Sequence, residues 1–317
     1  MPGGIGNHAY FLAKELCGLG FGVTVLTEKR EHNQGEWRTF LSNNKDIKIL
    51  GISRRLIPTI TYFHRILAAN RLIRDGDWDA VIFSGKFPTW LNAIMPRSKS
   101  IVVIHGSEIR QRGLLKRLFY RGLKRAARIV CVSDFTKSEL VNHYTGIEIK
   151  DVVVINNGIR NDWTANQLNG KRDVTKLEMV TVGGIHRRKG QFNVIQALPR
   201  LIQVFPNAKY HIVGLPVEKE RLMEQIRNHK LEAHVIFHHG LSDNEVRNVL
   251  EGSQVFIMLS EHLENGDFEG FGTAVVEAMA LGLPAIGSKN SGIADAINDG
   301  HSGRLVDHKN IDGVIDA

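Results

Sequence analysis

The chain has 317 residues, of which 43% are hydrophobic and 23% charged, and its formal net charge is +8. These are ordinary globular values, and the length suits two domains better than one core. No apolar run approaches the roughly 20 residues that span a bilayer, and the N-terminus lacks the pattern of a signal peptide. Cys17 and Cys131 lie far apart without metal-ligand spacing, so we expect buried thiols in a reducing, cytoplasmic environment.

Short β-branched segments alternate with amphipathic segments along the chain. We predict strands over residues 22–26, 47–50, 80–83, 101–104, 129–132 and 152–155, and a second series over residues 178–182, 209–213, 235–237, 255–259, 285–287 and 304–306. We predict helices over residues 10–19, 65–74, 190–205, 219–228 and 243–252. Apolar strands joined by helices are typical of parallel sheets covered on both faces. The sequence therefore predicts an α/β protein of two Rossmann-like domains, residues 1–160 and 161–317, divided in the polar stretch at residues 157–175.

Both ends of the chain interrupt this pattern. Pro2-Gly-Gly-Ile-Gly6 is typical of the glycine-rich turn after a first strand, yet no strand precedes it. In a doubly wound sheet the first strand is central, so its absence would leave two neighbours unpaired. We therefore expect that the first strand is missing, and that the last segment, Asp312–Ala317, stops at the beginning of a helix.

Positive charge is concentrated in the first half. Residues 1–165 hold 25 Lys/Arg and 14 Asp/Glu, a net of +11, and the remainder hold 16 and 19, a net of −3. The segment Arg110–Arg128 has apolar residues at helical spacing with cations between them. We favour a solvated helix packed on its own domain; a helix on an anionic membrane surface is the alternative. No aromatic interleaving or nucleic-acid motif accompanies the charge, so we expect no nucleic-acid partner.

Two carboxylates, Glu269 and Glu277, flank the predicted start of a helix near Gly272. The apolar run of this helix ends at Gly282 and Pro284, which are both stop signals. Backbone N–H groups at the helix start would lie between the carboxylates, which suits a ligand that carries both hydroxyls and phosphate. Taken alone, such a pair is more typical of two surface acids on a solvated helix.

A second candidate segment is Thr181–Gly190. It follows a predicted strand, turns on two glycines that include Gly184, and presents Arg187, Arg188 and Lys189 at the start of the next helix. Cations beside helix N–H groups favour a diphosphate. A plain surface turn is equally compatible with the sequence.

Two further positions lie at the ends of predicted elements. His105 directly follows the strand over residues 101–104, at the edge where parallel sheets bind ligands, although a lone histidine is more often structural. Gly4 lacks a Cβ and could let a phosphate or sugar approach the backbone closely.

Together these segments resemble the retaining glycosyltransferases of family four, which have the GT-B fold. The resemblance covers nearly the whole chain, and the block Glu269–Pro284 is its most specific part. The other matching motifs are Pro2-Gly-Gly-Ile-Gly, His105-Gly, Val132-Ser-Asp-Phe-Thr-Lys, Asn157-Gly-Ile, Arg188-Lys-Gly and Ser291-Gly-Ile. The resemblance implies two Rossmann-like domains with an interdomain cleft. It also implies transfer of a sugar from a UDP- or GDP-linked donor to a glycan or lipid-linked acceptor, as in polysaccharide assembly.

The resemblance implies a role for each matching residue. Glu277 would bind the ribose hydroxyls, and Glu269 would face the donor sugar beside the backbone N–H groups of Gly270, Phe271 and Gly272. An enzyme of this kind would be cytoplasmic, and peripheral at the inner membrane face if the basic segment binds anionic lipid.

The leaving group and the reacting carbon involve other residues. Lys189 would hold the diphosphate and stabilise the leaving nucleoside diphosphate, with Gly4 close to it. His105 would contact the donor sugar near the reacting carbon. Positive side chains would neutralise the leaving group, so we expect neither a metal ion nor another cofactor.

The chain departs from the family pattern at Gly184, where arginine usually follows the glycine after the strand. Arg187 or Arg188 would then reach the diphosphate instead. The acidic segment at residues 261–267 also precedes Glu269. We favour a solvated loop for it, with a role in shaping the donor or acceptor pocket as the alternative.

Two other classes of function stay open. Gly4-Ile-Gly-Asn-His-Ala9 nearly fits the dinucleotide fingerprint of a nicotinamide-dependent oxidoreductase, with Glu28 after the following strand. That interpretation leaves the block Glu269–Pro284 unexplained. A catalytically impaired binding protein with the same fold is the other alternative, because of the chain ends and Gly184.

Overall fold

The computed structural model describes residues 4–29, 47–53, 58–96, 99–159, 163 and 176–317. Residue contacts divide the chain into two compact units. The first unit contains Met1–His105, Gln111–Val130 and Tyr144–Val153, and the second contains Gly106–Arg110, Cys131–His143 and Val154–Ala317. The predicted boundary at residues 160 and 161, and most of the polar stretch around it, lie outside the described residues.

The first unit holds a two-stranded parallel sheet. β1 (Val23–Lys29) pairs with β2 (Ile47–Ser53), with Val23 opposite Ile47. Helix α1 (Gly4–Gly18) covers this sheet, and its Ala13 and Tyr10 pack with Ile47 and Val23. The truncated first strand expected from the sequence stays a prediction.

A second sheet of the first unit has the strand order β3-β4-β5-β6. Its strands are β3 (Val81–Ser84), β4 (Ser100–Ile104), β5 (Arg128–Cys131) and β6 (Val152–Val154), and its helices are α3 (Pro58–Asp75), α4 (Lys86–Asn92) and α5 (Gly113–Arg125). Helix α5 is fixed to α4 at Gly122, where an added Cβ would meet the Thr89 carbonyl oxygen at 2.0 Å. Asn92 Nδ2 donates to the Gly122 carbonyl at 2.7 Å. The basic helix therefore packs on its own domain through its apolar side.

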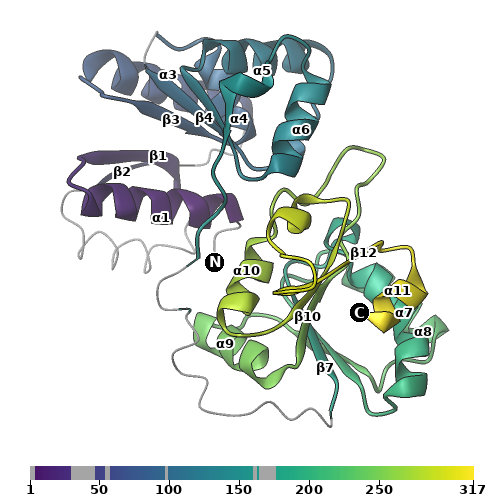
Figure 1. Ribbon diagram of the computed structural model, residues 1–317. Coiled ribbons are helices and arrows are strands. Elements are labelled where there is room, and N and C mark those ends of the chain that lie inside the picture. The colour runs from purple at the N-terminus through teal and green to yellow at the C-terminus, as the bar shows by residue number, and fades with distance from the viewer. Residues whose placement is uncertain (1–3, 30–46, 54–57, 97–98, 160–162, 164–175) are drawn as a thin grey trace. The chain divides into compact units, whose positions relative to one another are not determined.

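The second unit is built on a six-stranded sheet with the order β12-β11-β10-β7-β8-β9, whose strands pair in parallel. Its strands are β7 (Glu178–Val182), β8 (Lys209–Val213), β9 (Val235–His238), β10 (Val255–Met258), β11 (Ala285–Ser288) and β12 (Gly303–Val306). Figure 1 shows helices α7 (Gln191–Val204), α8 (Lys219–Asn228) and α11 (Ile311–Asp316) on one side of this sheet, and α9 (Asp243–Gly252) and α10 (Thr273–Ala280) on the other.

Neighbouring residues of β10 fill the two cores of this sheet. Ile257 packs with the cluster that holds Leu198 of α7, while Phe256 packs with the cluster that holds Val275 of α10. Successive side chains of a strand point to opposite faces, so a continuous apolar strand needs cover on both sides. This confirms the predicted class, an α/β protein with parallel sheets in two Rossmann-like domains.

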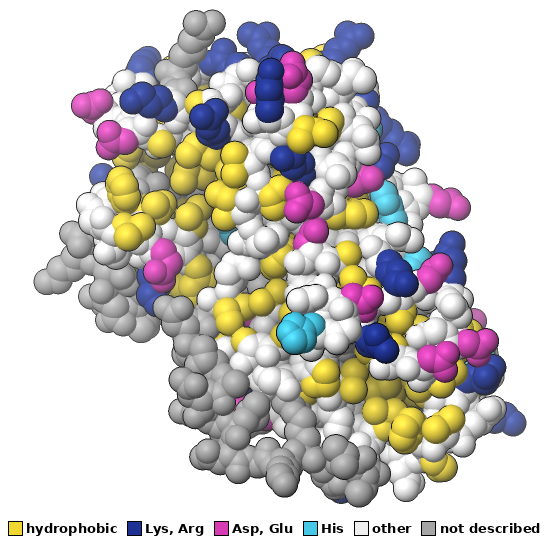
Figure 2. Space-filling model, viewed as in Figure 1, with side chains coloured by type: hydrophobic (Ala, Val, Ile, Leu, Met, Phe, Trp, Pro, Cys, Tyr) yellow, Lys and Arg dark blue, Asp and Glu magenta, His cyan; other side chains and the backbone are white. Residues whose placement is uncertain are grey.

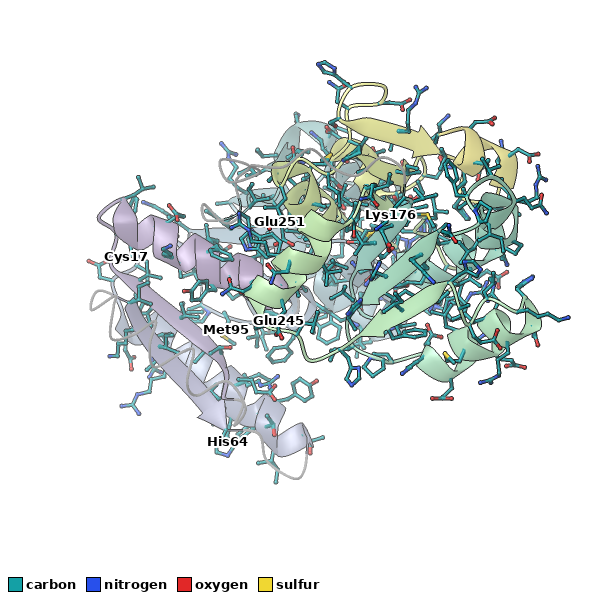
Figure 3. The ribbon with its side chains drawn as sticks, turned by 90° about the horizontal axis from the view of Figure 1, so that it is seen from below. Cys17, His64, Met95, Lys176, Glu245 and Glu251 are labelled. Atoms are coloured by element: carbon teal, nitrogen blue, oxygen red, sulfur yellow. The ribbon has the colours of Figure 1, made fainter. Side chains whose placement is uncertain are left out.

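Helix α9 shows why some boundaries could be predicted closely. Ser242 accepts a hydrogen bond from the Glu245 N–H and donates its own N–H to Glu245, which is a capping box. Arg247 and Glu251 form an ion pair one turn apart, 2.7 Å from Nε to Oε1. Figure 3 labels Glu245 and Glu251 on this helix. The helix spans the predicted residues 243–252.

The two cysteines differ in burial. Cys131 is fully buried, as expected, whereas Cys17 on α1 is partly exposed, and neither forms a disulfide. Within the described ranges, none of the helices has the length and apolar character needed to cross a bilayer.

We expect Gly190→Ala to lower the free energy of unfolding by more than about 2 kcal/mol. Gly190 has φ of +81° before α7, and an added Cβ would meet the Leu259 carbonyl oxygen at 2.0 Å. The left-handed conformation alone costs a residue with a Cβ roughly 1–2 kcal/mol, and the backbone contact adds to this. Urea denaturation followed by circular dichroism measures the change.

Gly252→Ala is the matched control for this substitution. Gly252 ends α9 and has open space where a Cβ would lie. Alanine there should leave stability unchanged or raise it by up to about 1 kcal/mol. A Gly190→Ala variant as stable as Gly252→Ala would contradict the close approach of the two loops.

Candidate functional site

The strand order of the second unit reverses between β7 and β10. The chain runs from β7 outward through β8 to β9, and then returns to β10 on the other side of β7. The loops that follow β7 and β10 therefore leave the same edge of the sheet at neighbouring positions. In open α/β sheets this switch point is where ligands bind.

The two loops meet through charged side chains. The turn after β7 carries three cations, and each pairs with a carboxylate of the loop after β10. Arg187 Nε lies 3.1 Å from Glu261 Oε1, Arg188 Nε lies 3.2 Å from Asp267 Oδ1, and Lys189 Nζ lies 2.7 Å from Glu269 Oε2. Arg188 also contacts Glu269 through Nη1. We call these six residues the charge cluster: Arg187, Arg188, Lys189, Glu261, Asp267 and Glu269.

Glu269 is the buried member of the charge cluster, with 8% of its surface exposed. Burial alone would raise the pKa of its carboxyl group. The charges of Lys189 and Arg188, together with their hydrogen bonds, outweigh that effect and lower the pKa of Glu269 to about 2. Glu269 is therefore an anion at neutral pH, held by two cations from one turn.

The acidic loop at residues 261–267 differs from the solvated loop that we favoured. Glu261 and Asp267 bind Arg187 and Arg188, and the Glu261 side chain is only 14% exposed. The sequence showed a run of acids and a separate run of cations. Which acid meets which cation depends on the strand order that brings the two loops together.

Backbone groups after Glu269 are packed tightly. An added Cβ on Gly292 would meet the Gly270 carbonyl oxygen at 2.0 Å. Ser133 Oγ and Thr136 Oγ1 also donate to this carbonyl, at 2.5 and 3.0 Å. These two residues belong to the Val132-Ser-Asp-Phe-Thr-Lys motif, at the start of α6 (Asp134–His143). We did not assign them a role from sequence.

The backbone N–H groups of this loop differ from the Gly270 carbonyl in their hydrogen bonding. Within the described part of the chain, the N–H groups of Gly270, Phe271 and Gly272 donate to no acceptor, and all three residues are buried. Buried backbone N–H groups are nearly always paired in folded proteins. These groups are therefore candidates to bind a ligand.

Helix α10 begins at Thr273, directly after Gly272, which confirms the predicted helix start. Gly272 has φ of +82°, a conformation that favours glycine. Glu277 lies one turn inside this helix and is partly exposed. The two glutamates therefore flank the N-terminus of α10, as the spacing predicts.

Gly184, where the chain departs from the family pattern, lies in a turn that a buried glutamine holds. The Gly184 carbonyl accepts a hydrogen bond from Gln191 Nε2 at 3.1 Å, and Gln191 is fully buried. An added Cβ on Gly184 would lie 3.3 Å from the ring of His186. A side chain at this position would press on His186.

The predicted residues Gly4 and His105 belong to the first unit. Gly4 begins α1 with open space around it. His105 directly follows β4, and its Nε2 lies 2.8 Å from Ser84 Oγ at the end of β3. Its ring meets that of His8 edge-on at 4.8 Å. Burial, with a smaller effect of His8, lowers the pKa of His105 to about 3.

His105 is therefore a neutral hydrogen-bonding group at physiological pH. Its neighbours His8 and Ser84 were missed in the sequence analysis. Ser84 could have been found, because it follows the strand predicted over residues 80–83 at the same sheet edge. His8 had no comparable signal, since its contact with His105 depends on how α1 packs.

Comparison with known proteins connects this geometry to glycosyltransferases. Residues 2–163 match a family model described as Glycosyltransferase Family 4, and residues 165–317 match one described as Glycosyl transferases group 1. WcaL of Salmonella typhimurium, named as a colanic acid biosynthesis glycosyltransferase, is 28% identical over 214 residues, which are 66% of this chain and 52% of WcaL. The chain spans about half the length of these curated relatives.

Solved structures show the same fold. A glycosyltransferase from Rickettsia africae superposes with a TM-score of 0.77 at 20% identity, covering 99% of this chain and 83% of that protein. Anabaena HepE, in a complex with UDP and glucose, superposes with a TM-score of 0.73 at 17% identity, covering 100% and 85%.

We expect the stabilising contribution of Glu269 to depend on pH. Its pKa is lowered from 4.5 to about 2 in the folded chain. A carboxyl group whose pKa is lower in the folded state stabilises that state at pH values above its pKa in the unfolded chain. This stabilisation is lost as the pH falls through the pKa of the folded state. The loss between about pH 4.5 and pH 2 should be on the order of 3 kcal/mol. Urea unfolding of the wild type and of Glu269→Gln across this range measures it.

Glu264→Gln controls for the loss of one carboxylate, because Glu264 is an exposed acid of the same loop. The stability difference between wild type and Glu269→Gln should shrink on acidification. A difference independent of pH would contradict the role of Glu269 as the anion of the charge cluster.

Proposed function

Because the chain belongs to glycosyltransferase family 4, we propose that it is a retaining glycosyltransferase that moves a sugar from a nucleoside-diphosphate donor to an acceptor. The observation that carries this proposal is the buried Glu269 carboxylate, which Lys189 and Arg188 hold beside the start of α10. The fold is that of the GT-B glycosyltransferases. The same switch point offers cations for a diphosphate and N–H groups for hydroxyls.

The second unit would bind the donor. Lys189 and Arg188 would hold the diphosphate, and Arg188 is preferred to Arg187 because it shares the carboxylate that Lys189 contacts. The side chain of Arg187 is 51% exposed and pairs with Glu261 instead. Arg188 would thus supply the charge that Gly184 lacks. UDP or GDP is proposed as the nucleotide, and HepE, which has the same fold, has been solved with UDP.

The ribose and the sugar would be bound around α10. Glu277 would accept hydrogen bonds from the ribose hydroxyls, since a carboxylate is a pure acceptor. Glu269 and the N–H groups of Gly270, Phe271 and Gly272 would bind the hydroxyls of the donor sugar. The low pKa of Glu269 keeps it an acceptor at neutral pH.

Two residues of the first unit also have proposed roles. We propose the roles that the family resemblance implies, with Gly4 close to the diphosphate and His105 close to the reacting carbon. His105, with a pKa of about 3, would act as a neutral group that can donate and accept hydrogen bonds. It would not serve as a charged acid at neutral pH.

Bond breaking would rely on charge stabilisation. As the bond between the sugar and the diphosphate breaks, negative charge develops on the leaving nucleoside diphosphate. Lys189 and Arg188 are fixed cations next to that position, and preorganised charge of this kind is an efficient source of catalysis. We therefore propose a reaction that requires no metal ion, and we assign no nucleophile.

The acceptor is proposed to be a glycan or lipid-linked precursor, as the relation to WcaL suggests. Helix α5 supports a membrane-bound acceptor. Figure 2 shows Lys and Arg side chains gathered over the side of the first unit that carries α5. Its exposed residues include Leu114, Arg117, Arg121 and Lys124, which recur at helical spacing on the side opposite Phe119. Such a helix can lie on an anionic lipid surface, which would place the protein at the inner face of the cytoplasmic membrane.

We expect UDP or GDP to raise the melting temperature of the protein, and NAD to leave it unchanged. A screen of nucleotide sugars in the presence of EDTA should then find one that is slowly hydrolysed. Glu277→Ala should weaken nucleotide binding by about 10- to 100-fold, because hydrogen bonds to a charged group contribute roughly 1.5–3 kcal/mol. Glu269→Ala should weaken nucleotide binding less, since its proposed partner is the sugar.

The competing classes give different results in the same assays. Stabilisation by NAD alone would contradict the proposed transferase and support a nicotinamide-dependent enzyme. Binding of UDP or GDP, with neither hydrolysis nor transfer for any donor, would identify a binding protein that has lost catalysis.

We expect the protein to sediment with vesicles that contain phosphatidylglycerol at low salt, and to be released at high salt. Replacing Arg117, Arg121 and Lys124 by serine should abolish sedimentation, because each basic residue near an anionic surface contributes about 1 kcal/mol. The control replaces Arg227, Lys230 and Lys309, exposed cations of the second unit. Equal loss in both triple variants, or no sedimentation of the wild type, would exclude α5 as the membrane contact.

A further inference from the structure

The charge cluster is balanced in the protein itself. Three cations face three carboxylates, so the turn at Arg187–Lys189 has no net positive charge to offer an anion. A diphosphate brings at least two more negative charges to the same place. A diphosphate would therefore bind more tightly once a carboxylate leaves one of the cations.

The two carboxylates that pair with Arg188 differ in how easily a ligand can displace them. The Glu269 side chain is 10% exposed and also holds Lys189, so moving it would strand a buried charge. The Asp267 side chain is 39% exposed, and its Oδ1 lies 3.2 Å from Arg188 Nε. Ion pairs with an exposed partner contribute little free energy. Asp267 is thus the displaceable partner.

The loop holds Asp267 next to Arg188. The Asp267 carbonyl accepts from the Leu263 N–H at 2.9 Å, and the Asp267 N–H donates to Asn265 Oδ1 at 2.9 Å. Gly266 has φ of +85° and packs on the Arg110 side chain, where an added Cβ would meet Cγ at 2.5 Å. The Asp267 backbone is anchored by these contacts, while its carboxylate can rotate into water.

We propose that Asp267 is an affinity-determining residue of the donor site, which acts through Arg188 by competing with the phosphate of the ligand. In the free protein its carboxylate neutralises Arg188, and the ligand's diphosphate takes its place. This inference rests on the proposed function for the nature of the ligand. The competition itself rests on the contacts of Arg188.

The test measures binding of inorganic pyrophosphate and of UDP by calorimetry at low salt. Asp267→Asn keeps the shape of the side chain and removes its charge. It should bind both ligands about two- to five-fold more tightly than the wild type, which corresponds to the free energy of a partly exposed ion pair. The gain should shrink at high salt. Asp267→Glu should restore affinity towards that of the wild type.

Two controls identify the route of the effect. Glu264→Gln, in the same loop, should leave affinity within a factor of about 1.5, since an exposed charge distant from the ligand is largely screened. In an Arg188→Gln background, Asp267→Asn should give no gain in affinity, because the cation for which Asp267 and the ligand compete is absent. Circular dichroism and the melting temperature confirm that each variant is folded.

The outcomes are distinguishable. Weaker binding by Asp267→Asn would make Asp267 a residue that merely positions Arg188, and unchanged binding would remove it from the site; either overturns the inference. The inference is also overturned if neither the wild type nor Asp267→Asn binds pyrophosphate. A wild type that binds pyrophosphate but not UDP, and whose melting temperature GDP does not raise, would refute the proposed donor, while the Asp267 comparison with pyrophosphate would still decide the competition.

Discussion

A buried carboxylate cannot stay charged without partners, and the second unit is organised around this constraint at Glu269. Removing one charge from water costs several kcal/mol unless opposite charges and hydrogen bonds replace the lost hydration. Lys189 and Arg188 provide both. They can do so because β7 and β10 are neighbours at the point where the strand order reverses. The conformation of the loop before α10 thus depends on a turn about 80 residues earlier in the chain.

Glycines let the two loops approach closely enough for this contact. At Gly190 a Cβ would lie 2.0 Å from the Leu259 carbonyl oxygen of the facing loop, and at Gly292, which follows β11, a Cβ would lie equally close to the Gly270 carbonyl oxygen. Long side chains such as those of lysine and arginine could reach a carboxylate across many arrangements. The backbone contact at Gly190 reduces the number of these arrangements. The glycine of the Arg188-Lys-Gly motif is therefore a structural requirement of the charge cluster as well as a mark of the family.

The fold could be predicted in most of its parts, because its strands are continuous apolar runs and several helices have clear ends. β7, β8, α8 and α9 have the predicted bounds. Helices α4 and α6 were not predicted, since α4 carries a proline in its first turn and α6 buries only Thr136 and Leu140. The flanking of the α10 start by two glutamates could also be predicted. The pairing of Asp267 with Arg188 could not, because local sequence does not specify which distant charges a tertiary fold brings together.

The two units differ in the kind of polar group that they present at the ends of their strands. After β7 and β10 the groups are charged, and the cations there complement an anionic leaving group. The residues at the ends of β3 and β4, Ser84 and His105, are neutral, since burial keeps His105 uncharged beside Ser84 and His8. Neutral imidazole and hydroxyl groups both donate and accept hydrogen bonds, which matches sugar hydroxyls without attracting free phosphate. In the transferase that we propose, charge in the second unit would set the affinity for the diphosphate, while the neutral groups of the first unit would pair with hydroxyls.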